Sequence, residues 1–112
     1  MTTESLCLVY VTTPTQALAE RIAQNLLSEK LIACANILPA MTSLYEWKGK
    51  VQKDAEVVLL LKTRQALVPK ITERVLALHE YECPCVAALP LVGGHEAFLS
   101  WISSQTSGLD GL

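Results

Sequence analysis

A chain of 112 residues, of which 51% are hydrophobic and only 18% charged, is long enough to bury a core of its own. Its net charge of −2 provides no basic surface for nucleic acid or for an anionic membrane, so we expect neither as a partner. The charged share lies below the roughly 25% of an average soluble domain. We therefore expect a single domain, residues 1–112, that buries further apolar surface by self-association.

The ends and the cysteines of the chain bear on its location. Residues 1–5 lack the basic start of a signal peptide, and no window approaches the ~20 apolar residues of a membrane span. These features predict a cytoplasmic protein without a membrane partner. Cytoplasmic cysteines are kept reduced, so Cys7, Cys34, Cys83 and Cys85 are expected to be thiols.

The first third of the chain predicts a strand followed by a helix. Residues 6–13 are mostly apolar, which favours a strand in the middle of a sheet. Thr15 is placed to cap a helix over residues 16–30, with Lys30 in its last turn, where a cation complements the helix dipole. Apolar residues at three- and four-residue spacing predict which side of the helix packs in the core. They are Ala19, Ile22, Ala23, Leu26 and Leu27.

Residues 33–63 predict a long hairpin, around which the rest of the chain is organised. Its first limb is interrupted at Pro39, and Lys48-Gly49 supplies the turn, because glycine accepts the positive φ of tight hairpin turns. The return limb contains the uninterrupted apolar run 57–61. A run without polar positions cannot expose one face to water, so we expect it to be buried on both faces.

The last part of the chain predicts a helix, a strand and a short helix. A helix over residues 65–78 becomes regular near Leu67, because Pro69 is tolerated only in a first turn. Residues 79–85 are a loop, residues 86–91 a strand, and residues 96–102 a helix with Phe98, Trp101 and Ile102 facing inward. Small polar residues and glycine dominate residues 103–112, which we expect to be a frayed tail.

This order of elements predicts an α+β fold of the ferredoxin-like type, the split βαβ sandwich, with a long central hairpin and an extra C-terminal helix. Right-handed crossovers give a four-stranded antiparallel sheet with both main helices on one face. The other face is left bare, and self-association is the expected cover for it.

Cys83-Pro84-Cys85 is the clearest candidate for chemistry. Residues two apart in an extended segment project to the same face, so both sulfurs could reach one ion. Thiolate pairs select Cu(I) and also bind Zn²⁺, and His79 would supply a third ligand. The alternative is that both cysteines are ordinary small apolar residues at the start of a strand.

Several motifs in order resemble the CutA family, the divalent-cation tolerance proteins, over nearly the whole chain. The matching pieces are residues 31–39, 42–50 and 56–63, then His79-x-Tyr81-Glu82-x-Pro84, Ala88-Leu89-Pro90 and Phe98-Leu99-x-Trp101-Ile102. The resemblance implies a ferredoxin-like fold related to the PII signalling proteins. It also implies a homotrimer in which the hairpin reaches the neighbouring subunit, and a link to copper and other divalent metals.

The resemblance further implies a group of hairpin and loop residues near the trimer interface. The group consists of Tyr45, Trp47, Glu56, Lys62, His79 and Tyr81. A subunit cleft with aromatic rings, an acid and a base is typical of a small-molecule pocket, whereas a simple Glu56–Lys62 ion pair is the structural alternative. Where the family reads His-Pro-Tyr-Glu-x-Pro-Glu, this chain has Glu80 for the first proline and Cys85 for the last glutamate.

These observations favour a homotrimeric, cytoplasmic, non-enzymatic protein of divalent-metal tolerance or response. In this hypothesis Cys83, Cys85 and His79 hold copper or another soft or divalent metal, and no organic cofactor is expected. The rival hypothesis is a PII-like signalling module that binds a small molecule in a cleft of Tyr45, Trp47, Glu56, Lys62 and Tyr81 and acts on a partner protein. The sequence contains no P-loop, Rossmann glycine motif, G-x-S-x-G or H-E-x-x-H that would indicate an enzyme.

Overall fold

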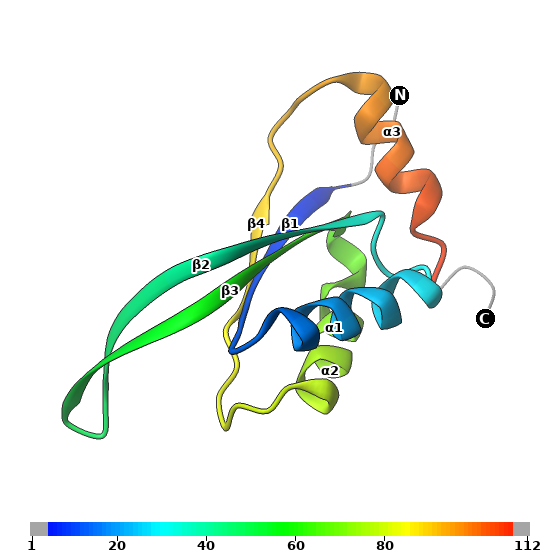
Figure 1. The fold of residues 1–112 in the computed structure, drawn as a ribbon. Helices are drawn as coiled ribbons and strands as arrows, with labels where there is room; N and C mark the ends of the chain where they lie inside the picture. The colour runs from blue at the N-terminus through cyan, green and yellow to red at the C-terminus, as the bar shows by residue number, and fades with distance from the viewer. Residues whose placement is uncertain (1–4, 109–112) are drawn as a thin grey trace.

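The computed structural model describes residues 5–108, which form one four-stranded antiparallel sheet and three α-helices (Figure 1). The elements are β1 (Leu6–Thr13), α1 (Gln16–Ser28), β2 (Cys34–Trp47), β3 (Lys50–Arg64), a 3-10 turn (Gln65–Leu67), α2 (Val68–Leu78), β4 (Val86–Pro90) and α3 (Glu96–Gln105). The strand order is β2-β3-β1-β4, so β1 lies in the interior of the sheet as predicted. The expected ferredoxin-like α+β fold is confirmed. Within residues 5–108 no helix is long and apolar enough to cross a membrane.

The core lies between the sheet and the pair α1 and α2, which cover the same face (Figure 1). Alternate residues of β1 and β3 point into it, including Val9, Val11, Leu59 and Leu61, which are all fully buried. We call the other side of the sheet, which carries Tyr10, the open face. Of the predicted α1 stripe, only Leu27 is exposed, and Leu18, which the predicted stripe does not include, is buried with the other four.

The helix ends confirm two expectations and correct one. The Thr15 hydroxyl accepts a hydrogen bond from the Leu18 amide at 3.2 Å, which caps α1. Pro69 lies in the first turn of α2, where its missing N–H costs no hydrogen bond. The prediction that Lys30 lies in the last turn of α1 is wrong. α1 ends at Ser28, and Lys30 has left-handed backbone (φ 60°), which turns the chain toward β2.

The hairpin of β2 and β3 covers residues 34–64, close to the predicted 33–63, and extends beyond the helical layer (Figure 1). Lys48 and Gly49 form its two-residue turn, with φ of 52° and 80°. Positive φ at both positions is the geometry that matches the twist of the strands.

One extra residue interrupts the pairing of β2 with β3. Leu38 pairs with Val58, but Met41 pairs with Glu56, and Ala40 between them has a φ of 64°. A bulge of this kind reverses the alternation of faces. Before it, the even-numbered residues of β2 lie on the open face; after it, the odd-numbered ones do.

The expectation for residues 103–112 is wrong for the described part. α3 continues to Gln105, and Thr106 is fully buried, with its hydroxyl bonded to the Ile102 carbonyl at 2.8 Å. Arg64 of β3 donates hydrogen bonds to Thr106 and so fastens the segment. Residues 109–112 lie outside the described residues. A composition of small polar residues indicated fraying, but buried hydrogen bonds hold these residues in place.

The inward orientation predicted for α3 applies to Ile102 only. Phe98 and Trp101 are each 40% exposed, and their rings stack on one another with centroids 5.7 Å apart. Ile102 packs with Leu6 and Ala33 in a small second cluster at the end of the sheet. α3 therefore covers only this end and leaves two aromatic rings at the surface.

Candidate functional site

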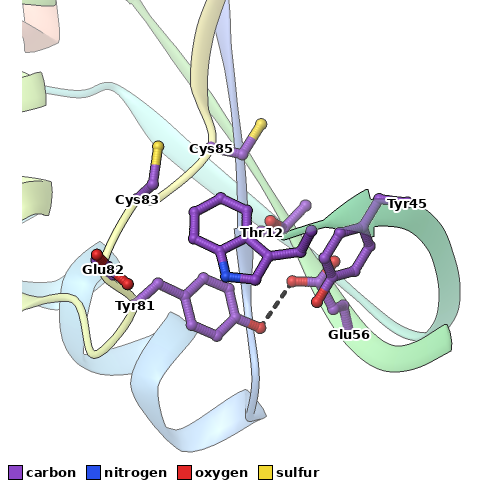
Figure 2. Close-up of a pocket in the computed structure, with 8 residues that line it drawn as sticks. Thr12, Tyr45, Glu56, Tyr81, Glu82, Cys83 and Cys85 are labelled. Carbon is purple, nitrogen blue, oxygen red and sulfur yellow. Dashed lines mark hydrogen bonds between the residues drawn. The ribbon is translucent and has the colours of Figure 1, made fainter. Parts of the chain in front are cut away.

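A pocket of about 370 Å³ opens on the open face, at the base of the hairpin (Figure 2). It is bounded by the end of β1, both hairpin strands and the loop before β4. Six residues singled out from the sequence line it, namely Tyr45, Trp47, Glu56, Tyr81, Cys83 and Cys85. Thr12 and Glu82 also contribute to its wall.

Glu56 and Tyr81 form the central contact of the pocket. The Tyr81 hydroxyl donates a hydrogen bond of 2.7 Å to Glu56 Oε2, drawn as the dashed line in Figure 2. Burial, and then this bond to a carboxylate, raise the pKa of the Tyr81 phenol above its usual value. Only 9% of Glu56 is exposed, and among residues 5–108 no Lys, Arg or His forms an ion pair with it. The pocket thus contains a largely buried carboxylate without a cationic partner.

A second tyrosine–carboxylate pair lies beside the first. The Tyr45 hydroxyl of β2 donates to Asp54 Oδ2 of β3, and this bond raises the pKa of Tyr45. Asp54 and Glu56 are two residues apart on β3 and therefore lie on the same face. The bulge in β2 is what places Tyr45 and Trp47 on that face as well.

His79 stands behind the pocket wall and not in it. Its Nδ1 accepts a hydrogen bond from the Tyr81 amide at 3.1 Å, and its Nε2 lies 2.7 Å from the Thr12 carbonyl oxygen. A carbonyl can only accept, so Nε2 carries the proton and both ring nitrogens are engaged. The imidazole also packs against the Tyr81 ring in a tilted arrangement, with centroids 4.6 Å apart and an interplanar angle of 40°. His79 therefore holds the loop against β1 and positions Tyr81.

Cys83 and Cys85 line the pocket as unpaired, exposed thiols. Burial of the sulfur, the charge of Glu56 and the neighbouring Cys83 raise the pKa of Cys85, which opposes formation of the thiolate that binds metal. Within residues 5–108 no three His, Cys, Asp or Glu side chains converge on a position for a metal ion. The predicted set of His79, Cys83 and Cys85 is thus not assembled in the isolated chain.

Lys62 lies outside the pocket. Its Nζ donates to Asn36 Oδ1 on the open face, and Lys62 pairs with Leu8 on β1, six residues along β3 from Glu56. The structural alternative, an ion pair between Glu56 and Lys62, is therefore not formed within residues 5–108. Six extended residues span roughly 20 Å, which is too far for the two side chains to meet.

A family model described as "CutA1 divalent ion tolerance protein" matches residues 7–105. The chain belongs to the CutA family. It is 48% identical to "Protein CutA, chloroplastic" of Arabidopsis thaliana over 88% of this chain, and it spans 54% of that relative's length. It is 44% identical to "Divalent-cation tolerance protein CutA" of Thermus thermophilus, over 88% of this chain and 95% of the relative. The crystal structure of CutA1 from Oryza sativa superposes with a TM-score of 0.91 at 47% identity, covering 95% of this chain and 97% of that one.

The two positions at which this chain departs from the CutA motif lie on the loop beside the pocket. Glu80 is exposed and does not line the pocket, so its carboxylate replaces a proline without entering the site. Cys85 does line the pocket and replaces a glutamate. That part of the pocket wall therefore carries a thiol in this chain.

Sequence reasoning missed Thr12 and Glu82 as pocket residues. Thr12 has the same parity on β1 as Tyr10, and an assignment of faces would have placed it next to the hairpin base. Glu82 follows Tyr81 directly, but a loop has no periodicity from which the direction of a side chain can be read.

Proposed function

We propose that this CutA protein is a homotrimer that acts in the cytoplasm in divalent-metal tolerance or response, and that it binds metal ions, copper foremost, without catalysing a reaction. Membership of a family described by divalent ion tolerance supports the metal link. Four unpaired cysteines fit a reducing compartment. The engagement of both His79 ring nitrogens supports a non-catalytic role, because it leaves the pocket thiols without a general base.

One observation carries the metal proposal. Apart from the tyrosines, the ionisable side chains lining the pocket are carboxylates and thiols, namely Glu56, Glu82, Cys83 and Cys85, and no Lys, Arg or His of the described residues lines it. Such a surface attracts cations. Two thiols on the wall of one pocket suit soft Cu(I), with the carboxylates of the same pocket supplying negative charge.

The metal proposal is tested by titrating the reduced protein with Cu(I) and comparing Cys83→Ser/Cys85→Ser with the matched control Cys34→Ser. Cys34 lies at the start of β2 and not in the pocket, so its loss should leave the affinity unchanged. The double variant should bind Cu(I) more than about tenfold more weakly, since even outer-shell residues of metal sites contribute this much. Equal affinity in wild type and the double variant would show that these cysteines are not the site.

Exposed apolar side chains support the homotrimer. Leu38 and Leu89 lie on the open face, each about half exposed. Solvent-exposed apolar groups on one face are typical of surfaces that associate. Sedimentation at micromolar concentration should give three times the 12.2 kDa chain mass. A stable monomer under those conditions would contradict the proposal.

The rival function, a PII-like module that binds a small molecule and acts on a partner protein, is favoured by a different observation. The pocket, at about 370 Å³, is large for a metal ion and includes the rings of Tyr45, Trp47 and Tyr81. Small-molecule sites commonly exceed roughly 300 Å³ and are rich in aromatic side chains. A ligand that raises the melting temperature of wild type and Lys62→Ala, but not of Trp47→Ala, would support this function. Stabilisation of Trp47→Ala to the same extent would contradict it.

A further inference from the structure

We infer that the pocket is a site for a small organic ammonium ion, held over aromatic rings and balanced by carboxylates. This inference rests on the second proposed function, the small-molecule cleft, and names the chemical class of its ligand. It is carried by the combination of a cavity, an aromatic wall and negative charge without a cationic partner.

Three aromatic rings form part of the pocket wall. Tyr45, Trp47 and Tyr81 approach the cavity from two separate parts of the chain, β2 and the loop before β4. The face of an aromatic ring carries partial negative charge, so a cavity with several rings favours a cation, especially one too poorly hydrated to prefer water. The Trp47 ring already has an ammonium near it, since the Lys48 Nζ lies 6.0 Å from the ring centroid.

The charge of the pocket points to the same class. Glu56 is largely buried and Asp54 lies beside it on β3, while Glu82 adds a third carboxylate from the loop. Within residues 5–108 no ion pair neutralises any of these three acids. Both phenol protons are already donated to carboxylates, Tyr81 to Glu56 and Tyr45 to Asp54, so the phenols have no O–H left for an anionic ligand.

The same geometry disfavours a bare metal ion as the occupant of the cavity. Aromatic faces provide no lone-pair ligands for a divalent ion, and no group of three metal-binding side chains converges in the described chain. The volume of about 370 Å³ suits a molecule of several heavy atoms. An organic ammonium matches the size, the aromatic wall and the charge together.

The experiment uses the two tryptophans of the chain. Trp101 lies on α3 and does not line the pocket, so Trp101→Phe leaves Trp47 as the only tryptophan fluorophore. In this background the protein is titrated with choline chloride, with n-butylammonium chloride and with 3,3-dimethylbutan-1-ol, the neutral isostere of choline, at constant ionic strength. We expect a saturable change with at least one ammonium ion and binding of the neutral alcohol about tenfold weaker or more. Comparing the affinities for choline and butylammonium then shows whether the site prefers a quaternary or a primary ammonium ion.

Matched variants test the roles of the ring and the carboxylate. Glu56→Gln should weaken ammonium binding about tenfold, whereas Glu80→Gln, an exposed acid on the same loop outside the pocket, should leave it unchanged. Tyr81→Phe keeps the ring and should retain binding, and Tyr81→Ala should lose it. Circular dichroism of each variant confirms that it is folded before it is compared.

Two outcomes would overturn the inference. One is equal affinity for choline and its neutral isostere with no saturable binding of butylammonium; the other is an equal loss in Glu80→Gln and Glu56→Gln. The Cu(I) titration of the same preparations separates this failure from that of the metal proposal. If the protein binds Cu(I) through Cys83 and Cys85 but binds no ammonium ion, the ammonium inference is refuted and the metal proposal stands. If it binds an ammonium ion but no Cu(I), the ammonium inference is supported and the metal proposal is refuted.

Discussion

Replacing Tyr81 with phenylalanine tests the central contact of the pocket. The change removes a 2.7 Å hydrogen bond to Glu56, a carboxylate that is 9% exposed, while keeping the ring that packs against His79. Hydrogen bonds to charged groups contribute about 1.5–3 kcal/mol. Tyr81 is only half-buried, so water can partly replace the hydroxyl, and we expect a loss near the lower end, about 1.5 kcal/mol. Urea unfolding should show a midpoint lower by roughly 0.7 M at an m-value of about 2 kcal/mol/M.

A control and a double-mutant cycle make this prediction specific. Tyr10→Phe removes a hydroxyl from the same open face whose hydrogen bond within residues 5–108 is a weak one to the Met41 thioether at 3.5 Å, and it should cost less than about 0.5 kcal/mol. In a Glu56→Met background, which lacks the acceptor, Tyr81→Phe should also cost under about 0.5 kcal/mol. All measurements need the same protein concentration because association shifts apparent stability. An equal loss with and without Glu56 would refute the assignment of the energy to this bond.

The remaining predictions concern pH, thiol reactivity and the core. The pKa of Tyr81 is higher in the folded protein than its ordinary value of 10.0. The protonated phenol therefore contributes fully to the stability of the fold below pH 10, and this contribution is lost as the pH rises above 10. Wild type should therefore lose stability above pH 10 relative to Tyr81→Phe, as thermal melts across that range would reveal. Cys85 should react with iodoacetamide at pH 8 more slowly than a free cysteine peptide, because its pKa is raised, and Glu56→Gln should speed the reaction, as mass spectrometry can follow. Leu59→Ala opens a cavity at a fully buried core position and should cost about 2–5 kcal/mol in denaturant unfolding, and a loss below 1 kcal/mol would contradict the assigned packing.

The sequence was sufficient for the fold because its strongest local signals agree with one another. The run 57–61 is buried as its lack of polar positions required, except that Leu60 on the open face is partly exposed. Lys48-Gly49 forms the turn because its backbone geometry is a local property. α3 was harder: Phe98 and Trp101 have the spacing of a core-facing pair, but the sheet face they would cover is already used by α1 and α2. Where a helix docks is decided by the whole chain, not by its own spacing.

The candidate site was predictable as a set of residues but not as an arrangement. Motif resemblance selected Tyr45, Glu56 and Tyr81, and these residues do meet. It also selected Lys62, which six residues of one extended strand separate from Glu56, and His79, whose ring is taken up by backbone partners. Hydrogen bonds to a main-chain carbonyl and to a main-chain amide cannot be predicted from residue types, because almost every residue carries both groups. The role of His79 is therefore visible only in the structure.

The extra residue in β2 gives the chain an unusual sensitivity to length. If Ala40 were absorbed into plain pairing from Leu38 onward, it would take the place opposite Glu56, and Tyr45 and Trp47 would turn to the helix side of the sheet. Deleting Ala40 would instead remove the bulge and keep Met41 opposite Glu56 with both rings on the open face, whereas deleting one residue between Met41 and Tyr45 would turn both rings away from the pocket. In comparisons among relatives, the number of residues between Met41 and Tyr45 is therefore as informative about ligand binding as the identities of the rings themselves.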